Sequence, residues 1–77
     1  MSDAPKVKPL EFDKYDNAMG AGAKFMVYEF GRDGAWNAVC YPHEGPHYTI
    51  ADSVSREGAV AAANADNAKR VIRWLEQ

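Results

Sequence analysis

The feature that most constrains this chain is a pair of apolar, aromatic runs joined by a short turn with a glycine at each end. The runs are residues 24–30 and 35–41, and the turn is Gly31-Arg32-Asp33-Gly34. Both runs are rich in residues that favour strands, and glycine permits the positive φ angles that tight hairpin loops need. The two runs are therefore predicted to form an antiparallel hairpin.

Side chains alternate between the two faces of such a hairpin, so the spacing assigns each residue to a face. One face is predicted to carry Phe25, Val27, Glu29, Trp36, Ala38 and Cys40. The other face is predicted to carry Met26, Tyr28, Phe30, Asn37, Val39 and Tyr41.

The rest of the chain supplies further elements. Residues 10–15 begin with alternating apolar and charged side chains and are predicted to form a short strand. Residues 19–23 hold two glycines among small residues and are predicted to be a flexible connection or bulge. Residues 47–51 are predicted to form another strand. With a helix at the C-terminus, the chain is predicted to be an α+β domain, an antiparallel three- to four-stranded sheet with one C-terminal helix packed on one face (β-β-β-α).

The helix is predicted to start after Ser55, which is a suitable N-cap, and Glu57 in its first turn is favourable to the helix dipole. Its buried side is expected to contain Val60, Asn64, Ala68, Val71, Ile72 and Leu75. Its solvated side is expected to contain Asp66, Lys69, Arg70 and Arg73. Because a buried amide needs hydrogen-bond partners, Asn64 is expected to bond to sheet backbone or to a tyrosine hydroxyl.

A thin two-layer domain needs large side chains in its core, which are expected to be Phe25, Trp36, Tyr48 and Trp74. The sheet face away from the helix would then expose Met26, Tyr28, Phe30, Val39 and Tyr41. An aromatic, methionine-bearing face of this kind is a candidate surface for a partner or for self-association. The alternative is that the N-terminal segment folds back across it.

Length and composition exclude several classes of protein. Seventy-seven residues build one core, so we expect a flexible tail over 1–8 and a single domain over 9–77. A formal charge of −2 gives no support to a general nucleic-acid binder. A single cysteine, Cys40, excludes an internal disulfide. No stretch approaches the roughly 20 apolar residues of a membrane span, so we expect no membrane association and a cytoplasmic location.

One segment matches a catalytic letter pattern. His43-Glu44-Gly45-Pro46-His47 fits the H-E-x-x-H of zinc peptidases, but that motif works only on a helix, which proline and glycine prevent here. A looser metal site of Cys40, His43 and His47 is a hypothesis with no paired C-x-x-C to support it. We therefore predict no catalytic residues, no bound metal and no cofactor.

Two stretches carry a family resemblance: Lys8-Pro9-Leu10-Glu11-Phe12, and the helix start from Ser55 to Asp66. They resemble small phage- and prophage-encoded proteins that open with a Lys-Pro-Leu-Glu-aromatic motif and close with a helix of this kind. Gly58 departs from the acidic or long side chain usual at its position. The resemblance implies a phage accessory protein that acts in a host bacterial cell, and by analogy of class an anti-CRISPR protein.

The resulting hypothesis is a non-catalytic protein-binding module that occludes a surface of a host complex, such as a CRISPR surveillance complex. Its expected contact residues are Glu11, Asp13, Asp16, Tyr28, Glu29, Asp33 and Tyr41. The acidic members would meet a basic nucleic-acid channel. The alternative is a small nucleic-acid-binding regulator that uses the hairpins with Lys69, Arg70 and Arg73. A monomer and a homodimer both remain open.

Overall fold

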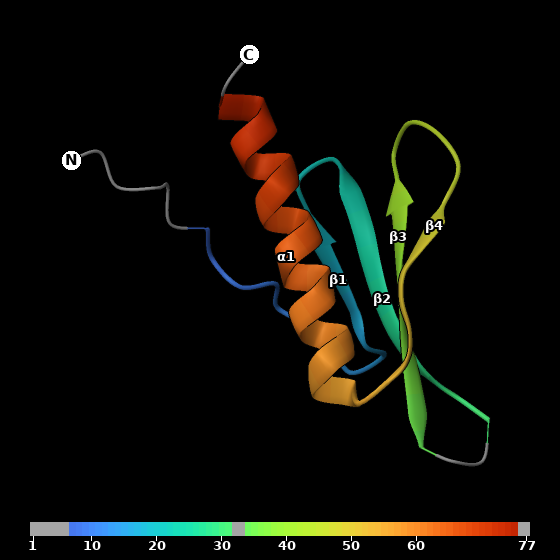
Figure 1. Cartoon of the computed structure of the whole chain (residues 1–77). Helices are drawn as coiled ribbons and strands as arrows, with labels where there is room; N and C mark the ends of the chain where they lie inside the picture. The colour runs from blue at the N-terminus through green and yellow to red at the C-terminus, as the bar shows by residue number, and fades with distance from the viewer. Residues whose placement is uncertain (1–6, 32–33, 76–77) are drawn as a thin grey trace.

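A computed structural model describes residues 7–31 and 34–75 of the chain. These residues form four strands followed by a helix (Figure 1). The elements are β1 (Asn17–Gly20), β2 (Ala23–Phe30), β3 (Ala35–Pro42), β4 (Tyr48–Val54) and α1 (Arg56–Leu75). The strands form one antiparallel sheet in the order β1-β2-β3-β4, and α1 packs against it. The predicted α+β class is therefore confirmed, with four strands before the helix.

The central hairpin has the predicted arrangement. β2 and β3 pair in the register Phe25↔Cys40 and Val27↔Ala38, and these four residues are buried beneath α1. Gly31 and Gly34 both have positive φ angles, 78° and 70°, as the turn requires. Alternation on the strands thus places the core on one side of the sheet.

The first strand does not lie where its alternation predicted it. Residues 10–15 are not a strand; the chain turns at Asp13, and β1 begins only at Asn17. The Asp13 carboxylate accepts hydrogen bonds from the backbone N–H groups of Tyr15 (2.8 Å) and Asn17 (3.0 Å). Aspartate often bonds its own local backbone in this way, and here that turn replaces the short strand.

The expected connection at residues 19–23 is also different. Met19 and Gly20 complete β1, Ala23 begins β2, and only Ala21 and Gly22 form the turn. Gly22 has a φ of 65°. A two-residue loop with positive φ joins antiparallel strands tightly, so Gly22 allows this short connection.

The pairing of β3 with β4 shifts register twice, between Trp36 and Ala38 and between Ala38 and Val39, and the second shift redirects side chains of β4. Ala38 pairs with Ala51 but Val39 pairs with Thr49, so the register shifts at Ile50. Ile50 and Ala51 both pack against the core as a result.

The helix begins as predicted, because the Ser55 hydroxyl accepts a hydrogen bond from the Gly58 N–H at 3.0 Å. Its buried stripe is rotated from the predicted one, however, and consists of Ala59, Ala63 and Asn67. Small side chains there let α1 lie close to the sheet, while Val60, Val71 and Ile72 are half-buried at its flanks. The predicted stripe member Leu75 is 64% exposed.

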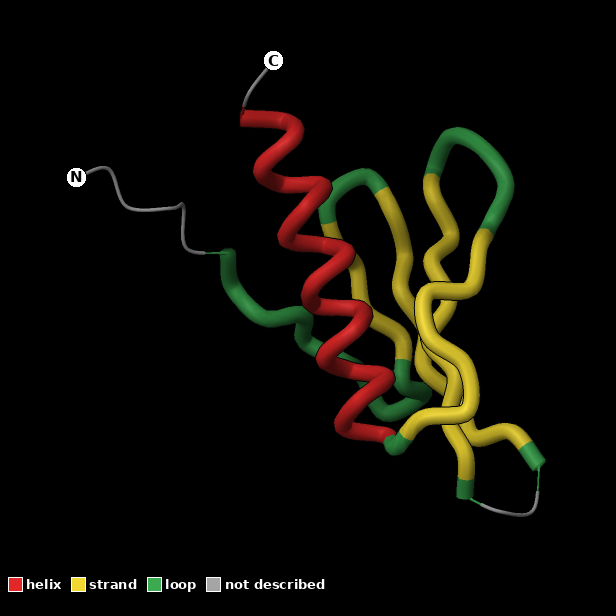
Figure 2. Tube along the Cα trace, in the orientation of Figure 1, coloured by secondary structure: helices red, strands yellow, loops and turns green. Residues whose placement is uncertain are grey.

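The N-terminal segment 7–12 lies beside α1, on the same side of the sheet (Figure 2). Leu10 and Phe12 pack against the core, and the Leu10 N–H donates to Asn64 Oδ1 at 2.6 Å. Asn64 therefore bonds to the N-terminal segment. The predicted bond to sheet backbone or to a tyrosine hydroxyl is wrong. The opposite sheet face is covered by no element in the described part of the chain.

Candidate functional site

The sheet face away from α1 is left without a covering element among the described residues (Figure 1). It is called the open face below. By strand register it consists of Asn17, Met19, Lys24, Met26, Tyr28, Phe30, Ala35, Asn37, Val39, Tyr41 and Thr49. Lys24 is the one charged residue at these positions. The face is therefore dominated by aromatic, apolar and uncharged polar side chains.

A hydrogen-bonded network holds the middle of the open face. Asn37 is only 7% exposed, and its Nδ2 donates to the Tyr28 hydroxyl at 3.1 Å. Its Oδ1 accepts from the Ser53 N–H of β4 at 2.9 Å. Ser53 has a φ of 57°, in the left-handed region that non-glycine residues rarely adopt. The hydrogen bond from Asn37 on β3 therefore restricts the side chain of Tyr28 on β2, which lowers the entropy that this side chain would lose in a contact.

A row of stacked groups lies at the end of the open face nearest the β3–β4 loop. The Lys24 ammonium lies 5.1 Å from the centre of the Tyr41 ring. That ring stacks on His47, with ring centroids 5.3 Å apart and planes at 27°. Cation–π and stacking contacts therefore orient Tyr41, which is half-buried, while Lys24 and His47 are exposed.

Apolar side chains are exposed elsewhere on the open face. Phe30 is 59% exposed and Met19 is 65% exposed. Between them, Met26 and Tyr28 are half-buried and Val39 is buried. Aromatic residues and methionine are enriched at the centres of protein interfaces, where charged residues are depleted. The open face has this composition.

The structure divides the predicted contact residues between separate places. Tyr28 and Tyr41 lie on the open face, whereas Glu29 is exposed at a position that faces the helix side. Asp13 holds the turn before β1, and Asp16 forms an ion pair with Arg56 at 2.8 Å. Glu11 is exposed on the N-terminal segment. Asp33 lies outside the described residues. The predicted acidic residues therefore form no single patch with the tyrosines.

The possible metal ligands are not brought together. Cys40 is fully buried beneath α1, while His43, Glu44 and His47 are exposed in the β3–β4 loop. No three metal-binding side chains gather anywhere in residues 7–31 and 34–75.

A polar cluster on the helix side was missed at the sequence level. Tyr48 donates to Asp66 Oδ2 at 2.8 Å and accepts from the Arg70 guanidinium at 3.1 Å. Burial and hydrogen bonds to Cys40 and Asp66 raise the pKa of the Tyr48 hydroxyl to about 12, against an opposing effect of Arg70. The hydrogen bond to Tyr48 in turn raises the Arg70 pKa. Asp66 and Arg70 are thus half-buried partners of β4, in contrast to the solvated side predicted for them.

Two aromatic residues expected in the core lie nearer the surface. Tyr48 is 39% exposed and Trp74 is 60% exposed. Tyr48 keeps its hydroxyl in the cluster with Asp66 and Arg70, whereas Trp74 lies over Gly22, where an added Cβ would be 3.3 Å from its ring.

Asn67 was also missed, although it is 6% exposed. Its Oδ1 accepts a hydrogen bond from the Ala21 N–H at 2.8 Å, which joins α1 to the β1–β2 turn. The available signal was its spacing of three residues from Asn64, which places both amides along one side of a helix.

Comparisons with known proteins give no relative from which to transfer a function. A scan against protein-family models gives no match, and neither do searches of curated proteins and of solved structures. Within the described part of the chain, no helix combines the length and hydrophobicity needed to cross a bilayer.

Proposed function

We propose that the protein is a non-catalytic binding module that attaches to another protein through the open face. The observation that carries this proposal is an aromatic and apolar sheet face that no described element covers. Burial of Phe30, Met26 and Tyr41 against a partner would remove apolar surface from water, which is the main favourable term in protein association.

The chemistry of the face favours a protein as its partner. Tyr28 presents a large ring whose hydroxyl is already anchored by Asn37, so little side-chain entropy is lost on binding. Lys24 contributes one positive charge at the side, next to Tyr41. A partner surface with an apolar centre and a carboxylate at its edge would complement this arrangement.

The partner we propose is a host defence complex in the bacterial cytoplasm, such as a CRISPR surveillance complex, whose working surface the protein would occlude. The support is the resemblance of residues 8–12 and 55–66 to small phage proteins. The carboxylates of Glu11 and Glu29 are exposed on the helix side of the sheet, so they take no part in the contact proposed for the open face.

Pull-down from host lysate with and without nuclease, followed by mass spectrometry, tests this proposal. Wild-type protein should enrich one multi-subunit complex that survives nuclease treatment, and its expression should protect phages in a CRISPR-bearing host. Phe30→Ser and Tyr41→Ala should each reduce recovery of the complex several-fold. Leu75→Ser is a matched control, because Leu75 is 64% exposed at the end of α1, in the other layer.

The proposal is wrong if the open-face variants recover the same complex as the wild type, or if Leu75→Ser is equally impaired. Circular dichroism of each variant shows whether a loss of recovery reflects a loss of fold.

A second candidate function is binding of single-stranded nucleic acid by the same face. The observation that favours it is the row Lys24, Tyr41 and His47, because aromatic side chains on a sheet can stack with bases. The basic residues proposed to assist do not support it. Lys69, Arg70 and Arg73 lie on α1, in the other layer, and Arg70 is engaged by Tyr48.

Titration of labelled single-stranded RNA and DNA at increasing salt distinguishes the two functions. Binding of the labelled nucleic acid that falls steeply with salt and is lost in Tyr41→Ala would favour the nucleic-acid function. Absence of retardation at low salt, together with recovery of a nuclease-resistant complex, would favour the protein partner.

A further inference from the structure

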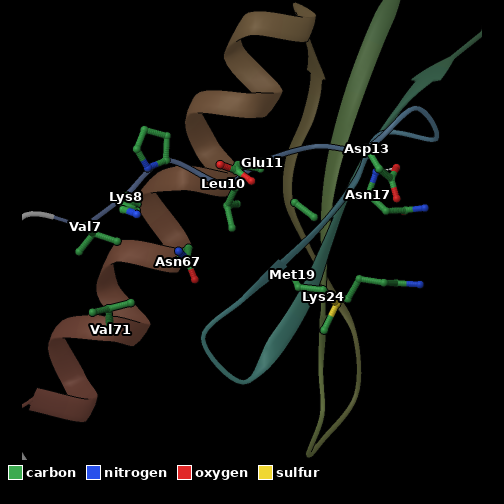
Figure 3. A pocket seen from close by; sticks show the side chains of 12 residues that line it. Val7, Lys8, Leu10, Glu11, Asp13, Asn17, Met19, Lys24, Asn67 and Val71 are labelled. Carbon is green, nitrogen blue, oxygen red and sulfur yellow. Dashed lines mark hydrogen bonds between the residues drawn. The ribbon is translucent and has the colours of Figure 1, made fainter.

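A cleft separates the outer edge of β1 from α1 and the N-terminal segment (Figure 3). Its volume is about 870 Å³, within the range of sites that hold small ligands and short peptides. Leu10 and Val71 line it with apolar groups, Asn67 lies on its α1 wall, and Met19 lies on its β1 wall.

The backbone of β1 presents hydrogen-bonding groups to this cleft. In an antiparallel pair, every second residue directs its N–H and C=O toward the partner strand, and the residues between direct theirs outward. The Val27 N–H donates to the Asp16 carbonyl at 3.1 Å, which sets the alternation. Asn17 and Met19 therefore face outward.

The outward groups of these two residues differ in their partners. The Asn17 carbonyl accepts from the Asp13 N–H at 2.8 Å, and the Asn17 N–H donates to the Asp13 carboxylate. The N–H and C=O of Met19 bond to no residue in the described part of the chain. The Met19 backbone thus offers the cleft one unpaired donor and one unpaired acceptor at the outer edge of β1.

Asn67 adds a third group from the opposite wall. Its Oδ1 is occupied by the Ala21 N–H, which fixes the orientation of the amide because an N–H cannot donate to the NH₂ end. Its Nδ2 donates to no described residue, although the side chain is more than nine-tenths buried. The amide therefore offers the cleft a positioned donor.

We propose that this cleft binds an extended segment of a partner polypeptide, which adds to β1 as a short fifth strand. One residue of the segment exchanges N–H···O=C bonds with Met19, and a carbonyl of the segment accepts from Asn67 Nδ2. Apolar side chains of the segment contact Leu10 and Val71. An extended peptide backbone supplies alternating donors and acceptors at this spacing, which is why strand addition to a sheet edge recurs in peptide recognition. The cleft shares Asn17, Met19 and Lys24 with the edge of the open face, but the added strand bonds to the backbone of Met19 and does not depend on the function proposed for that face.

Selection of random twelve-residue peptides displayed on phage against the immobilised full chain supplies the probe. The affinity of a selected peptide is then measured for wild type and for variants. Met19→Pro removes the outward N–H and keeps every β1–β2 bond, and proline is tolerated where an edge N–H faces solvent. It should weaken binding about tenfold, the effect of losing one buried hydrogen bond.

Two further variants separate the contributions. Met19→Ala removes the side chain and keeps the N–H, so its affinity should stay within about threefold of wild type. Asn67→Asp keeps an acceptor for the Ala21 N–H and loses the donor, so it should weaken binding as Met19→Pro does. Phe30→Ser, on the open face, should leave peptide affinity unchanged.

Hydrogen exchange on the unaltered chain tests the proposal even if a variant fails to fold. The selected peptide should slow exchange of the Met19 amide and leave that of Asn17, which is already bonded to Asp13, little changed. The proposal is overturned by selection of no peptide, by equal affinity for Met19→Pro, or by loss of binding in Phe30→Ser alone. It is also overturned if a second copy of the chain occupies the β1 edge and no peptide displaces it.

Discussion

At the scale of the residue, contacts between distant side chains hold α1 against the β1–β2 hairpin. Gly20 has no side chain because Asn67 and Phe25 occupy the space above it: an added Cβ would collide with Asn67 Oδ1 and lie 2.7 Å from the Phe25 ring. The same Asn67 oxygen binds the Ala21 N–H. The Asn67 side chain therefore packs over Gly20 and also fixes the position of the β1–β2 turn.

Gly20→Ala is expected to lower the free energy of unfolding by about 2–4 kcal/mol, because the added methyl displaces a buried, hydrogen-bonded amide. Urea unfolding followed by circular dichroism measures the change. Gly31→Asn is the control: Gly31 has open space around it and a φ of 78°, which asparagine adopts readily, so a change below about 1 kcal/mol is expected. Equal destabilisation of both variants would contradict the account.

Tyr48 gives the fold a dependence on alkaline pH. Its pKa is raised from 10.0 to about 12, so the folded state favours the neutral hydroxyl. A raised pKa contributes stability that is complete below pH 10 and is lost as the pH rises through about 12. The unfolding free energy of wild type should therefore fall across this range, and the fall should be smaller in Tyr48→Phe.

Denaturant titrations at several pH values from 9 upward, over roughly three pH units, measure how the unfolding free energy changes with pH. Tyr15→Phe serves as the control, because Tyr15 is 70% exposed and should leave the slope as it is in wild type. The same dependence of unfolding free energy on pH in wild type and Tyr48→Phe would show that Tyr48 does not cause it.

At the scale of the element, the helix start and the first strand show which local signals are dependable. The Ser55 cap operates within its own turn, where the hydroxyl meets the Gly58 N–H. The expected strand at 10–15 rested on alternation alone, and the turn formed by Asp13 replaced it. Short alternation is a weaker signal than a side chain that satisfies backbone groups beside it.

Ser55→Ala should lower the unfolding free energy by about 1 kcal/mol, because the Gly58 N–H loses its acceptor. Ser55→Asp should retain wild-type stability within about 0.5 kcal/mol, since aspartate is an equally good N-cap and its charge complements the helix dipole. Thermal unfolding of the three proteins compares them. A loss in Ser55→Asp as large as in Ser55→Ala would show that the cap is not what stabilises this end.

At the scale of the whole molecule, two layers and one flanking segment leave the open face uncovered in the described structure. Segment 7–12 is held on the helix side by Leu10 and Phe12, and by the bond from Leu10 to Asn64. Its packing there directs it away from the open face. The placement of one segment thus decides which face of the sheet stays uncovered in the described structure.

Phe12→Ala is expected to cost about 2–4 kcal/mol of unfolding free energy, because Phe12 packs against the core residues around Phe25 and around Val27, and its loss leaves a cavity. Tyr15→Ala, three residues further on and 70% exposed, should change stability by less than about 0.5 kcal/mol. Chemical unfolding measures both. Comparable values for the two variants would mean that the segment contributes nothing to the core.

The sequence by itself determined the parts that depend on neighbours in the chain. Glycine placement and alternation located the β2–β3 hairpin and assigned Phe25 and Cys40 to one face, and the cap located the start of α1. From these followed the fold class and the existence of a face away from the helix.

Only the tertiary structure decided the rotation of α1, the position of the N-terminal segment and the partners of Asn64 and Asn67. Periodicity states that a helix has a buried side, but among so many alanines several rotations bury similar apolar area. In the observed rotation Ala63 packs with Phe25, Ala59 packs with Val27, and Asn67 lies over Gly20. The same rotation places Arg70 against Tyr48. Such contacts join residues as many as 54 positions apart, and no local pattern in the chain records them.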